Sequence, residues 1–197
     1  LYVPTIYNPV TDTVPVIFNF HGYGGTASQQ LTSEDFRSIA DTANFIIALP
    51  QGTGSPTSFR MFGVPEAAEV DNNFVSDLLD TLILNYSIDT TKVYATGMSN
   101  GGFMAYEMAC QMSERFAKIA SISGSMVLQH YRVCNPQRPI PIMEIHGTAD
   151  GTVCYNGKDY KGSKSSLFIT TIHIDTLVQY WVQKNNCNPT PTISTLP

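Results

Sequence analysis

The stretch that decides the fold runs from Lys92 to Gly102 and reads KVYATGMSNGG. Its first five residues favour a β-strand, and the residues that follow Ser99 favour a helix. Gly97, Ser99 and Gly101 have the G-x-S-x-G spacing of a sharp strand-turn-helix bend, which raises a serine above the edge of a sheet. The two glycines are needed because such a bend leaves no room for a Cβ atom at their positions. We therefore interpret Ser99 as a nucleophile at a helix N-terminus, where the helix dipole favours negative charge; the alternative is a chance match to the pattern.

Outward from this bend, short apolar runs alternate with longer amphipathic runs. Four further apolar runs predict strands, at residues 14–20, 45–49, 119–122 and 140–145. Alternating strands and helices are typical of a mostly parallel sheet with helices on both faces. We therefore expect an α/β fold in one domain, residues 1–197, with its chemistry at the carboxyl ends of the strands.

The amphipathic runs predict the helices. The run at about 32–43 is expected to begin at a Thr32 or Ser33 cap and to bury one face, formed by Phe36, Ile39 and Ala40. Residues 51–70 are rich in Gly and Pro and predict a loop. Two more helices are expected, one from Asp71 to about Ile83 and a last one with Ile174, Leu177, Val178 and Trp181 on one face.

A glycine-rich loop follows the predicted strand at residues 14–20. It reads HGYGG from His21 to Gly25, and it stands where this kind of fold contributes one N–H group to an oxyanion hole. We predict that the backbone N–H groups of Tyr23 and Asn100 are the two donors. His21 is interpreted as structural, holding the loop through its ring nitrogens. The alternative for the whole segment is an ordinary glycine-rich turn.

The acid of a catalytic triad is predicted at Asp150. It lies in the segment HGTAD that follows the predicted strand at 140–145, after Ser99 in the chain, which fits the order Ser, Asp, His. Its carboxylate would orient an imidazole. The alternative is a turn residue, because Asp150-Gly151 is also a turn signal.

The base is harder to place. His173 is the one histidine after Asp150, and it is expected near the start of a helix, where a catalytic histidine does not belong. His130 is expected in a loop before the acid, which is the wrong order for the triad. We expect both to be non-catalytic and the base to lie outside this chain.

The composition argues against two classes of function and favours a secreted protein. The chain has 11 Lys and Arg against 16 Asp and Glu, a net charge of −5, so it lacks the cation excess with which a basic surface binds nucleic acid. Its apolar runs are too short to span a membrane. Charged residues make up 14% of the chain, and 36 residues are serine or threonine, a balance common in secreted proteins.

The four cysteines are Cys110, Cys134, Cys154 and Cys187. None of them forms a closely spaced pair, which favours two disulfides over a zinc site, with free buried thiols as the remaining alternative. Four cysteines allow three pairings, and the sequence leaves all three open.

Four motifs in order, FHGYGG, GMSNGG, HGTADGTV and the helix ending YWVQKNNC, resemble the polyhydroxybutyrate depolymerase-type esterases. These are α/β-hydrolases similar to the feruloyl and acetylxylan esterases of carbohydrate esterase family 1. The resemblance covers nearly the whole chain. It implies Ser99 as nucleophile, Asp150 as acid and a secreted carboxylic ester hydrolase. It also implies a domain that is incomplete at both ends, with the catalytic histidine in a segment beyond Pro197.

The leading hypothesis is therefore a serine esterase that works without metal or cofactor through an acyl-enzyme on Ser99. Its substrate would be a plant cell-wall polysaccharide ester or a polyester, and part of the pocket is expected in the loop from Thr53 to Gly63, with Phe59, Arg60, Met61 and Phe62. The rival is a non-catalytic α/β-hydrolase-like binding protein that lacks the histidine. A third hypothesis is a metal site formed by His21, His146 and Asp150.

Overall fold

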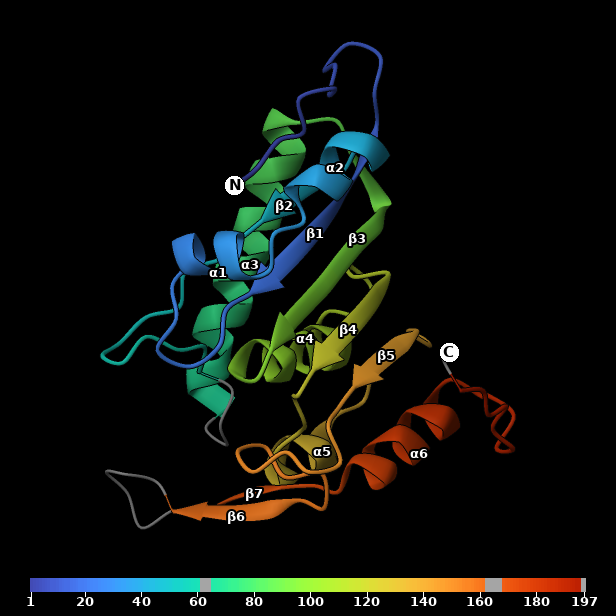
Figure 1. Ribbon diagram of the computed structural model, residues 1–197. Coiled ribbons are helices and arrows are strands. Elements are labelled where there is room, and N and C mark those ends of the chain that lie inside the picture. Colours follow the sequence, from blue (N-terminus) through green and yellow to red (C-terminus); the bar gives the residue numbers. More distant parts are fainter. Residues whose placement is uncertain (61–64, 162–167, 196–197) are drawn as a thin grey trace.

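The computed structural model describes residues 1–60, 65–161 and 168–195 (Figure 1). Its centre is a five-stranded sheet in the order β2-β1-β3-β4-β5, in which every neighbouring pair is parallel. The strands are β1 (Val14–Phe20), β2 (Ile46–Ala48), β3 (Ile88–Met98), β4 (Lys118–Ile122) and β5 (Ile142–Ile145). The predicted fold class is confirmed.

Helices cover both faces of this sheet, as predicted (Figure 1). On one face, Ile17 and Ile47 pack with Ala40, and on the other Val16 and Phe18 join the main core. The side chains of a strand point to opposite faces in turn, so the near-continuous apolar runs of β1 and β2 serve both layers. The helices are α1 (Ala27–Ser33), α2 (Arg37–Ala43), α3 (Pro65–Asn85), α4 (Asn100–Gln111), α5 (Leu128–Val133) and α6 (Ile174–Lys184).

The predicted helix at 32–43 is wrong in its extent, because two short helices occupy this region. The Thr26 hydroxyl accepts a hydrogen bond from Gln29 N and starts α1, and Asp35 Oδ1 accepts one from Arg37 N at the start of α2. Side chains of this kind satisfy free N–H groups at a helix start, and so a new helix begins after Asp35. Ile39, expected to be buried, is 54% exposed.

Two other expectations differ from the structure, and one further element was not predicted. α3 already begins at Pro65, inside the predicted loop, which fits the preference of proline for the first turn of a helix. His130 lies on the short helix α5 and not in a loop. A two-stranded antiparallel hairpin, β6 (Lys158–Lys161) with β7 (Phe168–Thr171), was not predicted because its sequence lacks an alternating apolar pattern.

The cysteines form one disulfide and not the two expected. Cys110, near the end of α4, is bonded to Cys134, which follows α5. Cys154 and Cys187 are free. The two free cysteines have different neighbours. Cys154 Sγ lies near Gly151 O, whereas Cys187 lines a groove beside α6. No described helix is both long and apolar enough to cross a membrane.

Candidate active site

The bend between β3 and α4 has the strained geometry that the sequence predicts. Ser99 has φ 54° and ψ −118°, which is unusual for a residue with a side chain. A Cβ atom on Gly97 would lie 2.5 Å from Phe20 O, and one on Gly101 only 2.0 Å from the same oxygen. The requirement for glycine at both positions is confirmed. Among the described residues, the Ser99 hydroxyl has no hydrogen-bond partner and caps no helix N–H group.

The loop after β1 lies directly against this bend. A Cβ atom on Gly22 would lie 3.9 Å from Ser99 Cβ. His21 is 1% exposed, and its Nε2 accepts a hydrogen bond from Gly52 N at 2.9 Å. Its Nδ1 therefore carries the proton and donates to Gly22 O at 2.7 Å. The prediction that His21 holds the loop through its ring nitrogens is confirmed.

The two predicted oxyanion donors belong to different elements. Tyr23 stands in the loop after β1, and Asn100 is the first residue of α4. The neighbouring N–H group of Gly24 is bonded to Thr57 O, whereas the N–H groups of Tyr23 and Asn100 have no acceptor among the described residues. Both groups are thus available to a ligand, and their role as an oxyanion hole stays a prediction.

The Asn100 side chain has a second task that sequence reasoning missed. Its Oδ1 accepts a hydrogen bond from Phe59 N at 2.8 Å, and its Nδ2 donates to Phe59 O at 3.2 Å. The amide therefore pairs with the backbone of a residue 41 positions away as a strand neighbour would. This pairing ties the loop after β2 to the nucleophile bend.

The predicted substrate contacts in that loop lie in different surroundings. Phe59 is 1% exposed and packs against the rings of Phe20 and His21, so in this conformation it is part of the core. Arg60 is exposed, and its backbone N–H group donates a hydrogen bond to Oδ2 of Asp71, a residue of α3. Contact of either residue with a substrate stays a prediction. Met61 and Phe62 lie outside the described residues.

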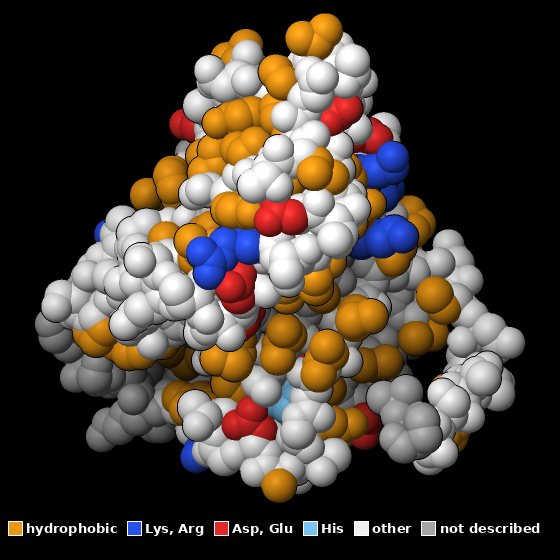
Figure 2. Space-filling view, turned by 45° about the horizontal axis from the view of Figure 1, so that its top comes forward, with side chains coloured by type: hydrophobic (Ala, Val, Ile, Leu, Met, Phe, Trp, Pro, Cys, Tyr) orange, Lys and Arg blue, Asp and Glu red, His pale blue; other side chains and the backbone are white. Residues whose placement is uncertain are grey.

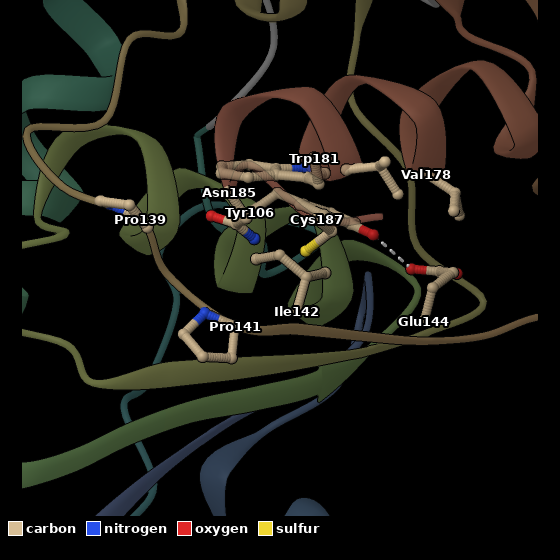
Figure 3. A pocket seen from close by; sticks show the side chains of 10 residues that line it. Tyr106, Pro139, Pro141, Ile142, Glu144, Val178, Trp181, Asn185 and Cys187 are labelled. Carbon is tan, nitrogen blue, oxygen red and sulfur yellow. Dashed lines mark hydrogen bonds between the residues drawn. The ribbon is translucent and has the colours of Figure 1, made fainter. Parts of the chain in front are cut away.

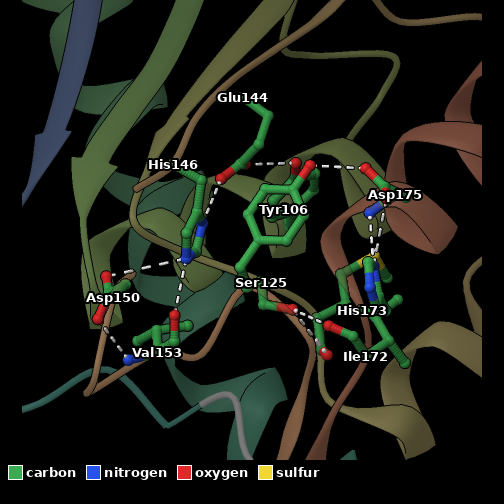
Figure 4. Close-up of polar contacts among 11 residues, drawn as sticks. Tyr106, Ser125, Glu144, His146, Asp150, Val153, Ile172, His173 and Asp175 are labelled. Carbon is green, nitrogen blue, oxygen red and sulfur yellow. Dashed lines mark hydrogen bonds and ion pairs between the residues drawn. The ribbon is translucent and has the colours of Figure 1, made fainter. Parts of the chain in front are cut away.

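Asp150 lies in the loop after β5 (Figure 4). Because β3 and β5 belong to one parallel sheet, their carboxyl ends place Asp150 at the same edge as Ser99. β3 and β5 are two strands apart, which corresponds to about 10 Å at the usual spacing. Asp150 Oδ1 accepts hydrogen bonds from Thr152 N at 2.8 Å and Val153 N at 3.0 Å. Partial burial acts to raise the pKa of Asp150, but these two N–H groups, the Ser123 side chain and the positive character of the His146 ring together lower it. Asp150 is therefore a carboxylate at neutral pH, with Oδ2 not engaged by the loop's N–H groups.

A buried polar network supports this loop and was not foreseen. His146 Nδ1 lies 2.9 Å from Glu144 Oε1, and Tyr106 donates its hydroxyl to Glu144 Oε2 at 2.7 Å (Figure 4). Burial raises the pKa of Glu144, and the hydrogen bonds from Tyr106 and His146 offset this only in part. One signal was present in the sequence: Glu144 is a charged residue inside the apolar run of β5.

No histidine of the chain reaches Ser99. His173 is the N-cap of α6, where its Nδ1 accepts a hydrogen bond from Asp175 N at 3.1 Å. His130 pairs with Glu107, with Nε2 and Oε2 2.9 Å apart. His21 and His146 are engaged as described above. The four histidines of the sequence all lie in the described residues, and none is hydrogen-bonded to the Ser99 hydroxyl.

The hypothetical metal ligands His21, His146 and Asp150 do not come together in the structure. In the described part of the chain, the one group of potential ligands close enough to share an ion is Cys110, His130 and Cys134, with ligand atoms within 4.8 Å. Both sulfurs are bonded to each other, so they are not available as thiolates. His21, His146 and Asp150 do not form such a group.

A groove of about 530 Å³ lies between β5 and α6, and its lining does not include Ser99 (Figure 3). Tyr106 and Trp181 stack at its floor with their ring centroids 6.1 Å apart. None of the predicted site residues lines it; the lining consists of Tyr106, Pro139, Pro141, Ile142, Glu144, Val178, Trp181, Val182, Asn185 and Cys187.

Figure 2 shows one face of the surface by side-chain type. On this face the Lys and Arg side chains of the described residues form small separate groups among apolar and uncharged ones. The distribution fits the net charge of −5 and gives no continuous basic surface there.

Comparison with known proteins places these features in context. The sequence model of the family described as "Prolyl oligopeptidase family" matches residues 33–165, which include the nucleophile bend and the acid loop. A bifunctional acetylxylan esterase/xylanase of Neocallimastix patriciarum is 28% identical over 200 residues, covering 99% of this chain and 27% of that protein. A feruloyl esterase B of Piromyces equi is 26% identical over 184 residues, covering 92% of this chain and 34% of that protein. The chain thus spans about a third or less of these relatives, and the resemblance to acetylxylan and feruloyl esterases is confirmed.

Among solved structures, a phospholipase/carboxylesterase from Dyadobacter fermentans superimposes with a TM-score of 0.65. The two sequences are 18% identical, and the match covers 94% of this chain and 85% of that one. At this identity the match supports the fold, and it agrees with the sheet order and the helix layers described above.

Proposed function

Since the chain belongs to the prolyl oligopeptidase family, a family of α/β-hydrolases, we propose that it acts as a secreted serine carboxylic ester hydrolase. The observation that carries the proposal is the backbone of Ser99. Ser99 is held at φ 54° between two glycines that admit no Cβ atom, and its hydroxyl forms no hydrogen bond with a described residue. Such strain is characteristic of a nucleophile positioned for attack.

In the proposed reaction, Ser99 Oγ attacks the ester carbonyl and forms an acyl-enzyme, which water then hydrolyses. The oxyanion is stabilised by the N–H groups of Tyr23 and Asn100, which are unpaired among the described residues. Asp150 orients an imidazole through Oδ2, because Oδ1 already accepts two backbone hydrogen bonds. That imidazole removes the Ser99 proton and then protonates the leaving alcohol.

The proposal requires a histidine that none of the four in this chain supplies in the structure. The matched segments make up 27% and 34% of the two relatives named above, and we propose that another segment of the natural protein contributes the base. The non-catalytic binding protein remains the competing hypothesis for this reason.

Acetyl or feruloyl esters of plant cell-wall polysaccharides are the proposed substrates, because the relatives are named for acetylxylan and feruloyl esters. Polyhydroxybutyrate is a further candidate from the sequence motifs. The exposed Arg60, next to the loop tied to Asn100, is the proposed contact with the substrate. Secretion is supported by the Cys110–Cys134 disulfide, which is stable in an oxidising compartment.

The test is hydrolysis of methyl ferulate, acetylated xylan and polyhydroxybutyrate by the natural full-length protein. We expect turnover of at least one ester, and a loss of about 10⁶-fold in kcat in Ser99→Ala. Ser38→Ala removes a hydroxyl from an exposed serine of α2 and should leave the rate unchanged. If no ester is cleaved and no serine-directed fluorophosphonate reacts, the binding-protein hypothesis is correct instead.

A further inference from the structure

The His146 ring lies between two hydrogen-bond acceptors. Its Nδ1 is 2.9 Å from a Glu144 carboxylate oxygen, and its Nε2 is 2.7 Å from Val153 O (Figure 4). A neutral imidazole carries one N–H group, so it can satisfy both contacts only when the His146–Glu144 pair holds one additional proton. The additional proton can lie on His146 Nδ1 or on Glu144. In both cases His146 Nε2 carries a hydrogen atom and donates it to Val153 O.

The same hydrogen bond closes a chain of contacts that ends at the acid. Val153 accepts from His146 through its carbonyl and donates through its N–H group to Asp150 Oδ1 at 3.0 Å. The Asp150 N–H group donates to Gly147 O at 3.0 Å and closes the turn. The loop from His146 to Val153 is therefore folded around the imidazole.

Packing supports this loop at Val153, which is 7% exposed and belongs to the main core, but not at its two glycines. A Cβ atom on Gly151 would meet nothing within 4 Å, and one on Gly147 would meet Asp150 N at 4.0 Å. The His146 side chain, in contrast, is 1% exposed, and that of Glu144 7%. The buried pair is thus a polar connection between the loop and β5, and Tyr106 of α4 donates to the other Glu144 oxygen.

We propose that His146, anchored by Glu144, is a positioning residue that fixes the acid loop so that Asp150 Oδ2 faces the catalytic imidazole. This inference rests on the proposed role of Asp150 as the acid. His146 does not touch the substrate; it acts through Val153 and Asp150. The 3.8 Å between His146 Nε2 and Asp150 Oδ2 is too long for a hydrogen bond, so His146 itself does not occupy that oxygen.

A double-mutant cycle on the natural full-length protein tests this. Asp150→Asn should lower kcat by about 10⁴-fold. His146→Gln should lower kcat by about 10²-fold, because the acid is displaced, and leave KM within about twofold. The double variant should be no slower than Asp150→Asn alone, because His146 has no effect once the carboxylate is gone. The matched control His173→Gln, at the exposed N-cap of α6, should retain the wild-type rate.

The outcomes separate the inference from the proposed function. Full activity of His146→Gln beside a strongly impaired Asp150→Asn overturns the positioning role alone. Losses that multiply in the double variant also overturn it, since His146 would then act independently of Asp150. Full activity of Asp150→Asn would show that Asp150 is not the acid of the triad, and it would contradict both the positioning role of His146 and the proposed reaction.

A second measurement applies even if His146→Gln does not fold. In ¹⁵N NMR of the histidine-labelled wild-type chain, we expect His146 Nε2 to be protonated and protected from exchange. The ionisable groups facing the ring are Glu144, Asp150 and Tyr155, whose ring centroid lies 5.9 Å away. An unprotonated Nε2, or a ring that exchanges freely with water, contradicts the hydrogen bond to Val153 and with it the positioning role.

Discussion

The nucleophile bend and the acid loop lie at the same edge of one sheet, yet different forces hold them. At the bend, a Cβ atom on Gly97 or Gly101 would lie 2.5 Å or 2.0 Å from Phe20 O, so close backbone packing fixes Ser99. In the acid loop, glycines have open space, and hydrogen bonds of His146 and Asp150 fix the chain. The bend should therefore be sensitive to volume and indifferent to pH, and the loop should show the opposite behaviour.

The largest effect is expected from Gly101→Ala. Its new Cβ atom would lie 2.0 Å from Phe20 O and 2.7 Å from Phe20 C, so β1 and α4 must separate. We expect a loss of about 4 kcal/mol or more in the free energy of unfolding, at the upper end of single substitutions. Urea unfolding followed by circular dichroism measures it. A loss below about 1 kcal/mol would show that the bend relaxes and is not fixed by packing.

Removing the disulfide should lower global stability without disturbing the bend. α4 carries Ser99 before its first turn and Cys110 near its end. The Cys110–Cys134 bond closes a loop with a sequence separation of 24, which corresponds to about 3 kcal/mol. Cys110→Ser with Cys134→Ser should lose that amount, whereas Cys187→Ser at an exposed free thiol should lose almost nothing. Reactivity of Ser99 at 10 °C should be unchanged; a parallel loss of reactivity would mean that the bend depends on distant support.

The stability that the acid loop contributes should depend on pH. The folded pKa of Asp150 lies below its unfolded value, so its contribution to stability is present above the unfolded pKa of about 3.9 and is lost as pH falls through the folded pKa. We expect Asp150→Asn to be less stable than the wild type at pH 6, and we expect this difference to shrink as pH falls through the folded pKa of Asp150. Unfolding free energies from pH 2.5 to 7 measure the difference. Ser99→Ala should show a constant difference over this range, because no ionisable group among the described residues is hydrogen-bonded to the Ser99 hydroxyl.

The smallest effect is expected from Gly151→Ala. No heavy atom lies within 4 Å of the added Cβ position, and the backbone is not in the left-handed region. The free energy of unfolding should change by less than about 0.5 kcal/mol. The same substitution at Gly101 is the matched contrast. A loss at Gly151 that approached the loss at Gly101 would remove the distinction between the two regions.

The bend could be predicted from the sequence because its cause is local. Two glycines around a serine, after an apolar strand, determine the backbone path within a few residues, and β1 is buried enough to appear as a single apolar run. The glycine-rich loop of His21 was predictable for the same reason, since its ring bonds to the adjacent Gly22.

The network beneath the acid could not be predicted because its partners are distant in sequence. Glu144 meets a tyrosine 38 positions earlier, and Asn100 pairs with a backbone 41 positions away. The break between α1 and α2 escaped prediction because local capping by Thr26 and Asp35 outweighed the apolar spacing of residues 36–40. The second disulfide was expected from an even cysteine count, which carries no distance information.

The central claim is that Ser99 is the nucleophile. The most direct test treats the natural full-length protein with a fluorophosphonate ester and locates the adduct by peptide mass spectrometry. We expect one adduct, on the peptide containing Ser99, and none in Ser99→Ala at equal fold stability. Ester hydrolysis that persists in Ser99→Ala, or an adduct on another residue, would contradict the claim.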